Sequence, residues 1–587
     1  MRKIKALVAI LLAIAFCVAL AACGGSNNDQ PANTGGGDQP ASTGGGSQPA
    51  DTGGGGGGGG APATQPAGTG IQEGTQVSEG GLTVAGVASP GTVDGTIGYG
   101  QKIEPLPGTQ FADVVNISIE VAVSMLDPQS SGGTSSANRL LSQTVYDRLT
   151  YFNEFQEVVP ELATSWETND AQTWVFHLRN DVTFHNGDKF TAQDVINTYK
   201  RALNDPASLA WNQWLEVDSV TALDDYTVEI VTKSPYASFA YNLTQPGGAI
   251  INQRAIDADP VKGAWIGTGP FYISDFVSGA TVECTRYDNY WGTKALTKQM
   301  NWVYVPEIAA RTVMQMNGEM DVTLSVSSED NEMFVADPGY IVYSYAANTT
   351  HSLTFSMIHP ITGDKNFRLA VAHAINREEA AIASSGRWAK PTQDGTFWGD
   401  STPFRNTSIP RIEQDLDKAK QYLADSTYNG EQLEILTAPD TLTVSSQMLQ
   451  EQLRAIGINC TVRTADVPSL VANSNYGDKN MTLLHFVSPF ELDPSAAKVV
   501  LYPEYGGNRA TYVNQEVIDL LDKVVGVTDP NEQRDIYYKI QEIVAEDLPQ
   551  ISIFEKIWTI VTNDRVGGII INPDMNHDLR GVFMIAE

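Results

Sequence analysis

The feature that most limits how this chain can fold is a long glycine-rich segment near its N-terminus. The octapeptides QPANTGGG, QPASTGGG and QPADTGGG begin nine residues apart, at Gln30, Gln39 and Gln48, and a run of glycines follows through Gly60. Such sequence buries too little apolar surface to offset the entropy of ordering it. It also lacks the aspartate and apolar positions of a calcium-binding β-roll. As a flexible coil, residues 24–70 reach on the order of 40 Å root-mean-square, so the folded part must come later in the chain.

The residues before this segment are typical of an exported lipoprotein. Arg2, Lys3 and Lys5 precede an apolar, uncharged stretch over 6–20, which has the length of a signal-peptide core and is short for a transmembrane span. Leu20-Ala21-Ala22-Cys23 then resembles the lipobox of bacterial lipoproteins. The alternative is an ordinary secretory signal with an incidental cysteine. We predict a signal peptide over 1–22, lipid on Cys23, which anchors without spanning, and a disordered tether over 23–70.

The charge and the cysteines narrow the class of protein. The chain has 37 basic and 69 acidic residues, a net charge of −32, and without the leader the balance is 34 against 69, or −35. This argues against nucleic acid or another anionic polymer as a partner. Once Cys17 leaves with the leader and Cys23 carries lipid, Cys284 and Cys460 remain. One pair can form a disulfide in an exported protein but is no framework.

The remaining chain is long and globular in composition. From about residue 111, strand and helix patterns interleave over roughly 475 residues, too many for one hydrophobic core, so two or more lobes are expected. Residues 71–110 are poor in charge and rich in Gly, Thr and Val, which leaves open whether they are tail or first strand. No transmembrane segment follows the leader in the sequence.

Motifs of catalysis are almost absent. The sequence has no G-x-S-x-G, H-E-x-x-H, C-x-x-C or G-x-x-x-x-G-K-[ST], and its seven histidines include no pair spaced four apart on a helix. Asp224-Asp225 lies in a turn before an alternating strand, and Asp170, Asp181 and Asp188 are loop acids. We therefore expect a binding protein, with no cofactor and no metal site, and not an enzyme.

The stretch TWVFHLRNDVTFHNGDKFTAQDV (173–195) tests that expectation, because it holds two histidines and three aspartates. Trp174, Phe176 and Leu178 alternate with polar neighbours, which predicts a half-buried strand with His177 facing outward. Asn186-Gly187 predicts a hairpin-type turn, and Thr191 with Asp194 predicts a capping box. Strand, turn and helix account for the stretch without chemistry, since nothing brings His177 and His185 together.

The second half continues the alternation. Residues 366–380 place Phe367, Ala370, Val371, Ala374 and Ile375 on one helical face. A strand over 433–439, an amphipathic helix over 445–457 that ends at Gly457 and a strand over 458–466 predict a parallel pair with a right-handed crossover. A helix capped by Asp529, with Pro530 at N1, runs to about Ala545, and LPQISIF (548–554) returns as a strand.

These segments, taken in order, resemble family 5 extracellular solute-binding proteins, the oligopeptide- and dipeptide-binding receptors of bacterial ABC importers. The resemblance rests on VVPELATSWE, TWVFHLRNDVTFHNGDKFTAQDV, GTGPF, YDNYWG, NFRLAVAHAINR, DLDKAKQYL and EIVAEDLPQISIF. It covers roughly residues 111–575, and 173–195 is its most specific part. The family also contains receptors for nickel complexes, oligosaccharides, opines and glutathione, so membership leaves the ligand open.

The resemblance implies an α/β fold of the periplasmic-binding-protein type (class II, cluster C), with two lobes that close on a ligand about a hinge of two crossing strands. It also implies a small extra domain on the first lobe. The expected divisions are lobe 1 over 111–154 and 263–345, the extra domain over 155–262, lobe 2 over 346–545, and a return to lobe 1 over 546–587.

The resemblance also implies ligand-binding positions, and here the sequence departs from the pattern. Peptide-binding members place an aspartate four residues before a proline in the second lobe, where it pairs with the ligand's α-ammonium. In LLHFVSPFELDPSA (483–496), Asp493 and the proline match but Phe490 holds that place, with His485 upstream. Phenylalanine offers at most a cation–π face, worth roughly 0.5–2 kcal/mol. Glu491 can substitute only with a one-residue shift, and in an extended strand it points away from Phe490.

Further candidates lie elsewhere in the chain. Asp127 follows the family's first strand in SMLDPQSSGGTSS (124–136), with Met125 and Ser130 beside it; this run offers hydroxyl and backbone contacts or is only a loop. A sugar would need aromatic platforms, for which Trp211, Trp214, Phe397 and Trp398 are candidates against core or rim packing. A metal chelate would need Arg387 or His485. A blocked or cyclic peptide would suit Phe490.

We thus expect a monomeric, lipid-anchored receptor on the outer face of the cell membrane, or in the periplasm of a Gram-negative cell. Its partners would be a small solute, most favourably an oligopeptide, and the membrane permease of an ABC importer; the membrane is reached through the lipid, and no nucleic acid is involved. The alternatives are the same role for a non-peptide ligand, or a surface adhesin or sensor built on this scaffold.

Overall fold

The computed structural model divides the chain into two compact units, residues 1–71 and 72–587. All residues that the structure describes belong to the second unit: 75–76, 82–86, 92–123, 125–130, 136–153, 155, 157–208, 210–347, 349–400, 402–438, 441–465, 469, 483–487, 497–503 and 508–587. The predicted leader, Cys23 and the tether lie outside them. Within these ranges, no helix has both the length and the apolar character needed to cross a membrane.

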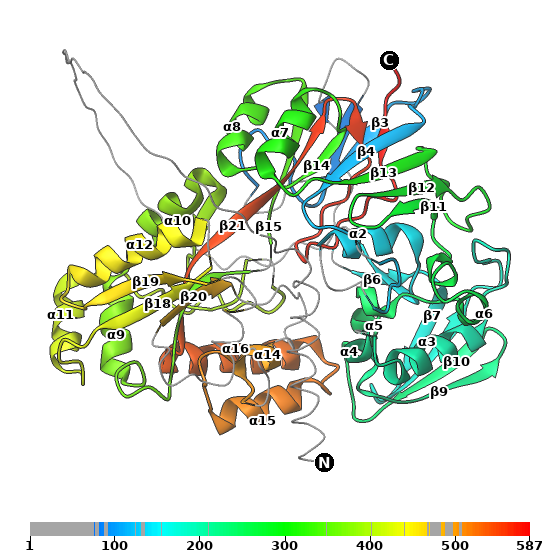
Figure 1. The fold of residues 1–587 in the computed structure, drawn as a ribbon. Coiled ribbons are helices and arrows are strands. Elements are labelled where there is room, and N and C mark those ends of the chain that lie inside the picture. Colours follow the sequence, from blue (N-terminus) through cyan, green and yellow to red (C-terminus); the bar gives the residue numbers. More distant parts are fainter. Residues whose placement is uncertain are drawn as a thin grey trace, which may run out of the picture. The chain divides into compact units, whose positions relative to one another are not determined.

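The dominant element is a twelve-stranded sheet (Figure 1). Ten of its strands follow the order β11-β12-β13-β4-β14-β21-β16-β20-β18-β19, and β15 and β17 also pair with β21. Their bounds are β4 Val114–Ile119, β11 Phe271–Val277, β12 Thr281–Arg286, β13 Gln299–Tyr304, β14 Val322–Leu324, β15 Tyr340–Ala346, β16 His351–Phe355, β17 Ala389–Pro391, β18 Leu433–Thr437, β19 Cys460–Thr464, β20 Leu483–Val487 and β21 Gln550–Asn563.

The sheet carries two hydrophobic cores. One is built on β4, β12, β13 and β14 with the C-terminal residues 566–583, and the other on β16, β18 and β20 with the helices around them. β21 joins the two: its first half pairs with β16 and β17, its second half with β14 and β15. This is the expected two-lobed α/β architecture, and the predicted strand over 548–554 is the first part of a longer shared strand.

The extra domain has its own core around a four-stranded sheet ordered β7-β8-β10-β9. These strands are β7 Ala163–Thr168, β8 Thr173–Leu178, β9 Val217–Asp224 and β10 Thr227–Thr232, and β5 (Thr150–Phe152) pairs with β6 (Val158–Pro160) beside them. Trp174, Phe176 and Leu178 are buried and His177 is exposed, as predicted. Gly187 turns the chain at φ +87°, and Thr191 and Asp194 form the predicted capping box at the start of α3 (Ala192–Asn204).

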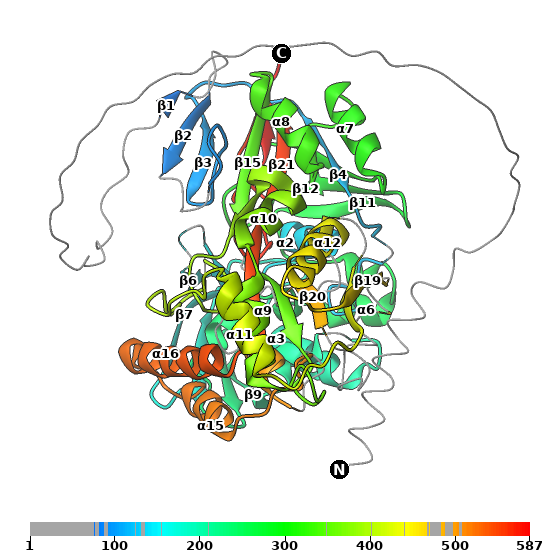
Figure 2. The ribbon, with the colours of Figure 1, turned by 90° about the vertical axis from the view of Figure 1, so that its left-hand side faces the viewer.

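The uncertain segment before residue 111 contains strands. β1 (Thr75–Gln76), β2 (Leu82–Gly86) and β3 (Gln101–Pro105) form a small sheet, drawn in blue in Figure 2. Two backbone hydrogen bonds attach the connection between β2 and β3 to β15: Ile97 N–H donates to the Val342 carbonyl at 2.9 Å, and Ser344 N–H donates to the Ile97 carbonyl at 2.8 Å. Residues 92–105 are therefore an ordered part of lobe 1.

Helices cover both lobes and follow the predicted patterns with one change. The helical face predicted over 366–380 is divided between α9 and α10, because Asn376 accepts a hydrogen bond from Glu379 N–H and starts a new helix. Its five apolar residues are all buried. The predicted parallel pair is present, with Leu433 opposite Cys460, and Asp529 caps α16 as predicted.

The helices are α2 Ser136–Val145, α4 Trp211–Trp214, α5 Phe239–Asn242, α6 Gln253–Ala258, α7 Ile308–Met316, α8 Ser328–Ala336, α9 Lys365–Ala374, α10 Arg377–Ser385, α11 Leu416–Ala424, α12 Thr441–Arg454, α14 Ala497–Leu501, α15 Gln515–Val524 and α16 Pro530–Asp547. Short 3-10 turns are η1 Pro246–Gly248, η2 Gly263–Trp265 and η3 Gly386–Trp388, and β22 (Val566–Gly567) pairs with β23 (Phe583–Met584).

Cys284 and Cys460 do not pair. Both are buried thiols, one on β12 in the core of lobe 1 and the other on β19 in the core of lobe 2. Burial raises the pKa of the Cys460 thiol to about 11 and that of Cys284 well above its ordinary value, so neither is a reactive thiolate.

Candidate functional site

The strand directions locate a site between the lobes. β21 runs from lobe 2 into lobe 1. β14 is antiparallel to it, from Val322 opposite Thr562 to Leu324 opposite Ile560, and β4 is parallel to β14, so both end toward lobe 2. In lobe 2, β16 is antiparallel to β21, β20 is antiparallel to β16, and β18 is parallel to β20. β18 and β20 therefore end toward lobe 1.

The carboxyl ends of the parallel strands of both lobes thus face the same boundary. In open α/β sheets, ligands bind outside the carboxyl ends of the strands. Here two such edges, the ends of β4 and β14 and the ends of β18 and β20, are directed toward each other. Of the predicted ligand residues, Asp127 and Ser130 follow β4 and His485 lies on β20.

Two segments cross between the lobes. One is the link from β15 to β16 across residues 347–350, and the other is the middle of β21, where Phe554 pairs into lobe 2 and Ile557 into lobe 1. These are the two crossing strands that the sequence resemblance implied. Their pairing partners change within four residues, which confines any bending of one lobe against the other to a short stretch of backbone.

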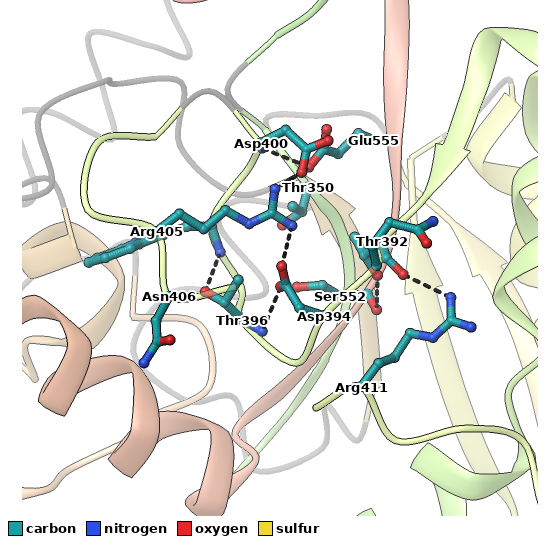
Figure 3. Close-up of polar contacts among 12 residues, drawn as sticks. Thr350, Thr392, Asp394, Thr396, Asp400, Arg405, Asn406, Arg411, Ser552 and Glu555 are labelled. Atoms are coloured by element: carbon teal, nitrogen blue, oxygen red, sulfur yellow. Dashed lines mark hydrogen bonds and ion pairs between the residues drawn. The ribbon is translucent and has the colours of Figure 1, made fainter. Parts of the chain in front are cut away.

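A buried cluster of charges lies at this crossing (Figure 3). Arg405 is ion-paired with Asp394 at 2.9 Å, with Asp400, and more distantly with Glu555 on β21 at 4.0 Å. Lys390, the cross-strand partner of Glu555, pairs with Asp400, and the Asp400 N–H donates to Glu555 Oε1 at 2.9 Å. Two cations therefore face three carboxylates, and we call these five residues the hinge cluster.

Glu555 is the unusual member of the hinge cluster. It is 1% exposed, and burial raises its pKa to about 7, although Arg405 and Lys390 act to lower it and Asp394 adds to the rise. Its Oε2 and the Nε of Arg405 are buried without a hydrogen-bond partner among the described residues. An incompletely hydrogen-bonded buried carboxylate is costly when ionised, so Glu555 changes charge near neutral pH.

The loop that carries these acids is also fastened to the crossing segments. Thr350 Oγ1, in the link between β15 and β16, donates to the Phe397 carbonyl at 2.9 Å. Gln541 of α16 accepts from Thr396 Oγ1 at 3.1 Å and from Asn406 N–H at 2.8 Å. Residues 394–406 thus connect the hinge to the helices of lobe 2.

Asp127 has structural partners in this conformation. Its carboxylate makes a two-point ion pair with Arg201 of α3, at 3.0 and 2.5 Å, and accepts from Gln129 N–H and from Ser130 Oγ at 3.0 and 3.1 Å. It therefore ties the loop after β4 to the extra domain. Met125, 47% exposed, is the most accessible of the predicted residues in this loop.

The aromatic candidates are mostly packed. Phe397 and Trp398 are buried in the core formed with α15 and α16, where Trp398 meets Tyr537 edge-on with ring centres 5.6 Å apart. Trp214 is fully buried and donates from Nε1 to the Gly247 carbonyl. Arg387 pairs with Glu332 of lobe 1 through two hydrogen bonds, at 2.6 and 2.7 Å.

The segment after β20 was the other predicted contributor. His485 lies on β20 opposite Leu353 and Thr437, whereas Phe490, Glu491 and Asp493 lie outside the described residues. The ligand roles of these residues, and of Trp211, remain predictions. Among the described residues, no group of three or more His, Cys, Asp or Glu is arranged to hold a metal ion.

The hinge cluster was not predicted from the sequence. Its one signal is Glu555-Lys556 inside the otherwise apolar strand QISIFEKIWTIV, where an acid in a buried run requires a partner. Arg405, Asp394 and Asp400 sit in a loop 150 or more positions earlier, and no local pattern connects them to β21.

A second buried cluster joins lobe 1 to the extra domain. Arg580 binds Asp578 at 2.9 Å, Glu161 at 2.7 Å and, more distantly, Asp147 at 3.7 Å. Its guanidinium also lies over the ring of Tyr151 at 4.5 Å. Beside it is a cavity of about 690 Å³ whose wall includes Tyr290 and Trp291. We call Arg580 and its three carboxylates the junction cluster.

Known proteins of similar sequence include proteins named for binding di/tripeptides and nickel. The chain is 26% identical over 483 residues to di/tripeptide-binding protein 4 of Pseudomonas aeruginosa, which covers 74% of this chain and 89% of that protein. It is 22% identical over 466 residues to the nickel-binding periplasmic protein of Escherichia coli, covering 74% and 88%.

Solved structures share the fold. An ABC transporter substrate-binding protein, CtaP, of Listeria monocytogenes matches with a TM-score of 0.73 at 22% identity, over 81% of this chain and 100% of that one. DppA of Helicobacter pylori, solved in complex with the peptide STSA, matches at 0.69 and 23% identity, over 81% and 99%. The two-lobed α/β fold is therefore confirmed.

The family model of bacterial extracellular solute-binding proteins, family 5, matches residues 157–507, well over half of the chain. That range includes most of the extra domain, the β15–β16 crossing and the strands β18 and β20. The chain therefore belongs to the family 5 bacterial extracellular solute-binding proteins.

Proposed function

We propose that this protein captures a small solute, most favourably an oligopeptide, between its two lobes and delivers it to the permease of an ABC importer. The observation that carries the proposal is the opposition of the two carboxyl edges across a two-stranded hinge. Relatives named for di/tripeptides and a fold neighbour that holds the peptide STSA favour a peptide. Delivery and the permease partner rest on the family.

A non-peptide solute is the second candidate, because a relative is named for nickel and another for heme. The replacement of the expected aspartate by Phe490 supports this alternative, since it removes the charge that would hold a free α-ammonium. A blocked or cyclic peptide is compatible with both observations. A surface adhesin or sensor would bind its partner without closing the lobes.

Native mass spectrometry of the mature chain, as purified, tests the proposal. A ladder of adducts that fragments into amino-acid residues is the result expected for a peptide receptor. A single adduct of non-peptide mass would contradict the peptide part and identify the ligand class. If no adduct is seen, calorimetric titration with trialanine decides whether the protein binds peptides. An absence of binding heat, together with no competition by trialanine against another bound solute, would contradict peptide binding.

We also propose that Cys23 carries the lipid that holds the protein at the outer face of the membrane, with residues 24–70 as its tether. The expected result for Cys23→Ser is release of the protein into the medium or periplasm, because in this proposal the lipid on Cys23 is what attaches it to the membrane. Membrane fractionation and mass spectrometry of the N-terminal peptide measure it. A Cys23→Ser chain that stays with the membrane would contradict the anchor.

A further inference from the structure

The extra domain and lobe 2 touch directly, away from the hinge. Ala237 N–H, just before α5, donates to the carbonyl of Val525 at 2.7 Å. Val525 is the C-cap of α15 in lobe 2, 288 positions further along the chain. Ala237 packs against the core of the extra domain, and Val524 belongs to the core of α15 and α16. The hydrogen bond therefore joins two separately packed bodies.

The groups around this bond are set for close approach. Gly526 lies against Pro235, so that a Cβ added at Gly526 would come to 3.0 Å from the Pro235 Cβ. On the extra-domain side, Tyr236 N–H donates to the Ala171 carbonyl at 2.7 Å. On the lobe 2 side, Gly526 N–H donates to the Lys523 carbonyl at 3.3 Å. Each partner is thus held by its own body, and the Ala237–Val525 bond and the Pro235–Gly526 contact cross between the two bodies.

The bond satisfies a group that would otherwise turn to water. The last carbonyls of a helix have no donor within the helix, and Ala237 supplies one at the end of α15. When the two bodies separate, both groups can be hydrated, so the contact is reversible at small cost. Small reversible cost and close fit are what a contact that forms and breaks in each binding cycle requires.

The contact closes a ring around the boundary between the lobes. The hinge joins lobe 1 to lobe 2, and the pairs Arg201–Asp127 and Arg580–Glu161 join lobe 1 to the extra domain. The Ala237–Val525 bond joins the extra domain back to lobe 2. We infer that residues 235–237 and 525–526 form a latch that sets the rate at which a captured solute leaves. This inference rests on the proposed function.

Two variants break the latch by different means. Gly526→Val places a branched side chain against Pro235 and forces the two loops apart. Ala237→Pro removes the donating N–H itself. Asp519→Val is the matched control, because it adds the same side chain at an exposed position of the neighbouring helix α15, where Asp519 accepts a hydrogen bond from Gln515 of the same helix. Equal melting temperatures for Gly526→Val and the control show that the fold is intact.

Hydrogen exchange of the full chain reads the latch directly. The Ala237 amide is expected to exchange at least about tenfold more slowly in the unaltered protein than in Gly526→Val, with Asp519→Val unchanged. With trialanine as the probe, stopped-flow release is expected to be about five- to tenfold faster in both latch variants, the effect of losing one hydrogen bond.

The outcomes separate the latch from the proposed function. Fast exchange of the Ala237 amide in the unaltered protein, or no acceleration in Gly526→Val, overturns the latch. Unchanged trialanine release in both variants overturns it as well. If trialanine does not bind the unaltered protein, peptide capture fails instead, and the exchange experiment on the solute-free chain still decides whether the latch exists.

Discussion

The hinge cluster and the junction cluster are alike in their central charged residues, but they differ in how completely those residues are hydrogen-bonded. Each places one arginine among three carboxylates, and each contains a glutamate whose pKa burial raises to about 7. In the junction cluster, every oxygen of Asp147, Glu161 and Asp578 accepts a hydrogen bond. In the hinge cluster, Glu555 Oε2 and Arg405 Nε are left without one among the described residues.

This difference separates a joint that is fixed from a joint that can move. A fully hydrogen-bonded buried network holds one arrangement, because every alternative loses a bond. A network with unused groups can exchange partners at lower cost. The junction cluster joins lobe 1 to the extra domain, whereas the hinge cluster sits where β21 crosses between the lobes. Three predictions test this contrast, in order of decreasing effect.

Arg580→Met should give the largest loss. It leaves Asp147, Glu161 and Asp578 buried without their cation, and breaking a buried ion network in this way costs about 3–5 kcal/mol. Chemical denaturation at pH 7.5 measures the change. Arg405→Met is the matched variant and should cost less, because Lys390 still pairs with Asp400 and Glu555 can take up a proton. A larger loss for Arg405→Met would remove the contrast.

The pH dependence of stability should have the sign set by Glu555 and Glu161. Both have a folded-state pKa of about 7 against an ordinary value of 4.5, so the folded chain binds more protons between these values. Their contribution to the free energy of unfolding is fully present below about pH 4.5 and is lost as the pH rises through about 7. The loss is at most about 3 kcal/mol for each group.

Glu555→Gln separates the two groups. It should flatten part of this decline and leave the part due to Glu161, with the gain in stability seen above pH 7. Urea denaturation in steps from pH 5 to pH 8 measures it. The same decline in Glu555→Gln as in the unaltered chain would show that the hinge glutamate is ionised throughout.

Thr350→Val should have the smallest effect on stability, about 1 kcal/mol, since it removes the bond from Oγ1 to the Phe397 carbonyl while keeping the shape. Tyr290→Phe, which removes the 3.2 Å bond to Asp147 in the junction cluster, is the counterpart and should cost about the same. Solute release should change only in Thr350→Val. Equal release rates in both would mean that residues 394–406 do not act on the hinge.

Local sequence patterns were enough to predict the helices and strands. Contacts between residues far apart in the sequence could not be predicted from such patterns. Alternation located β8, and capping residues located the starts of α3 and α16. The same capping logic, applied to Asn376 and Glu379, would have divided 366–380 into two helices. Glu161 and Arg580 meet across 419 positions, and Arg405 and Glu555 across 150; no local periodicity encodes such pairs. Ala237–Val525 is a backbone contact, so side-chain identity carries no signal for it.

The shared strand has a consequence for when the protein can fold. β14 pairs with β4 on one side and with β21 on the other. The sheet of lobe 1 is therefore complete only when Gln550–Asn563, close to the C-terminus, has been made. In lobe 2, β16 also pairs with β21. A ribosome must therefore make almost the whole chain before either lobe can close its sheet. The two lobes therefore complete their sheets late and together, whereas the extra domain has all four strands of its own sheet once Thr232 has been made.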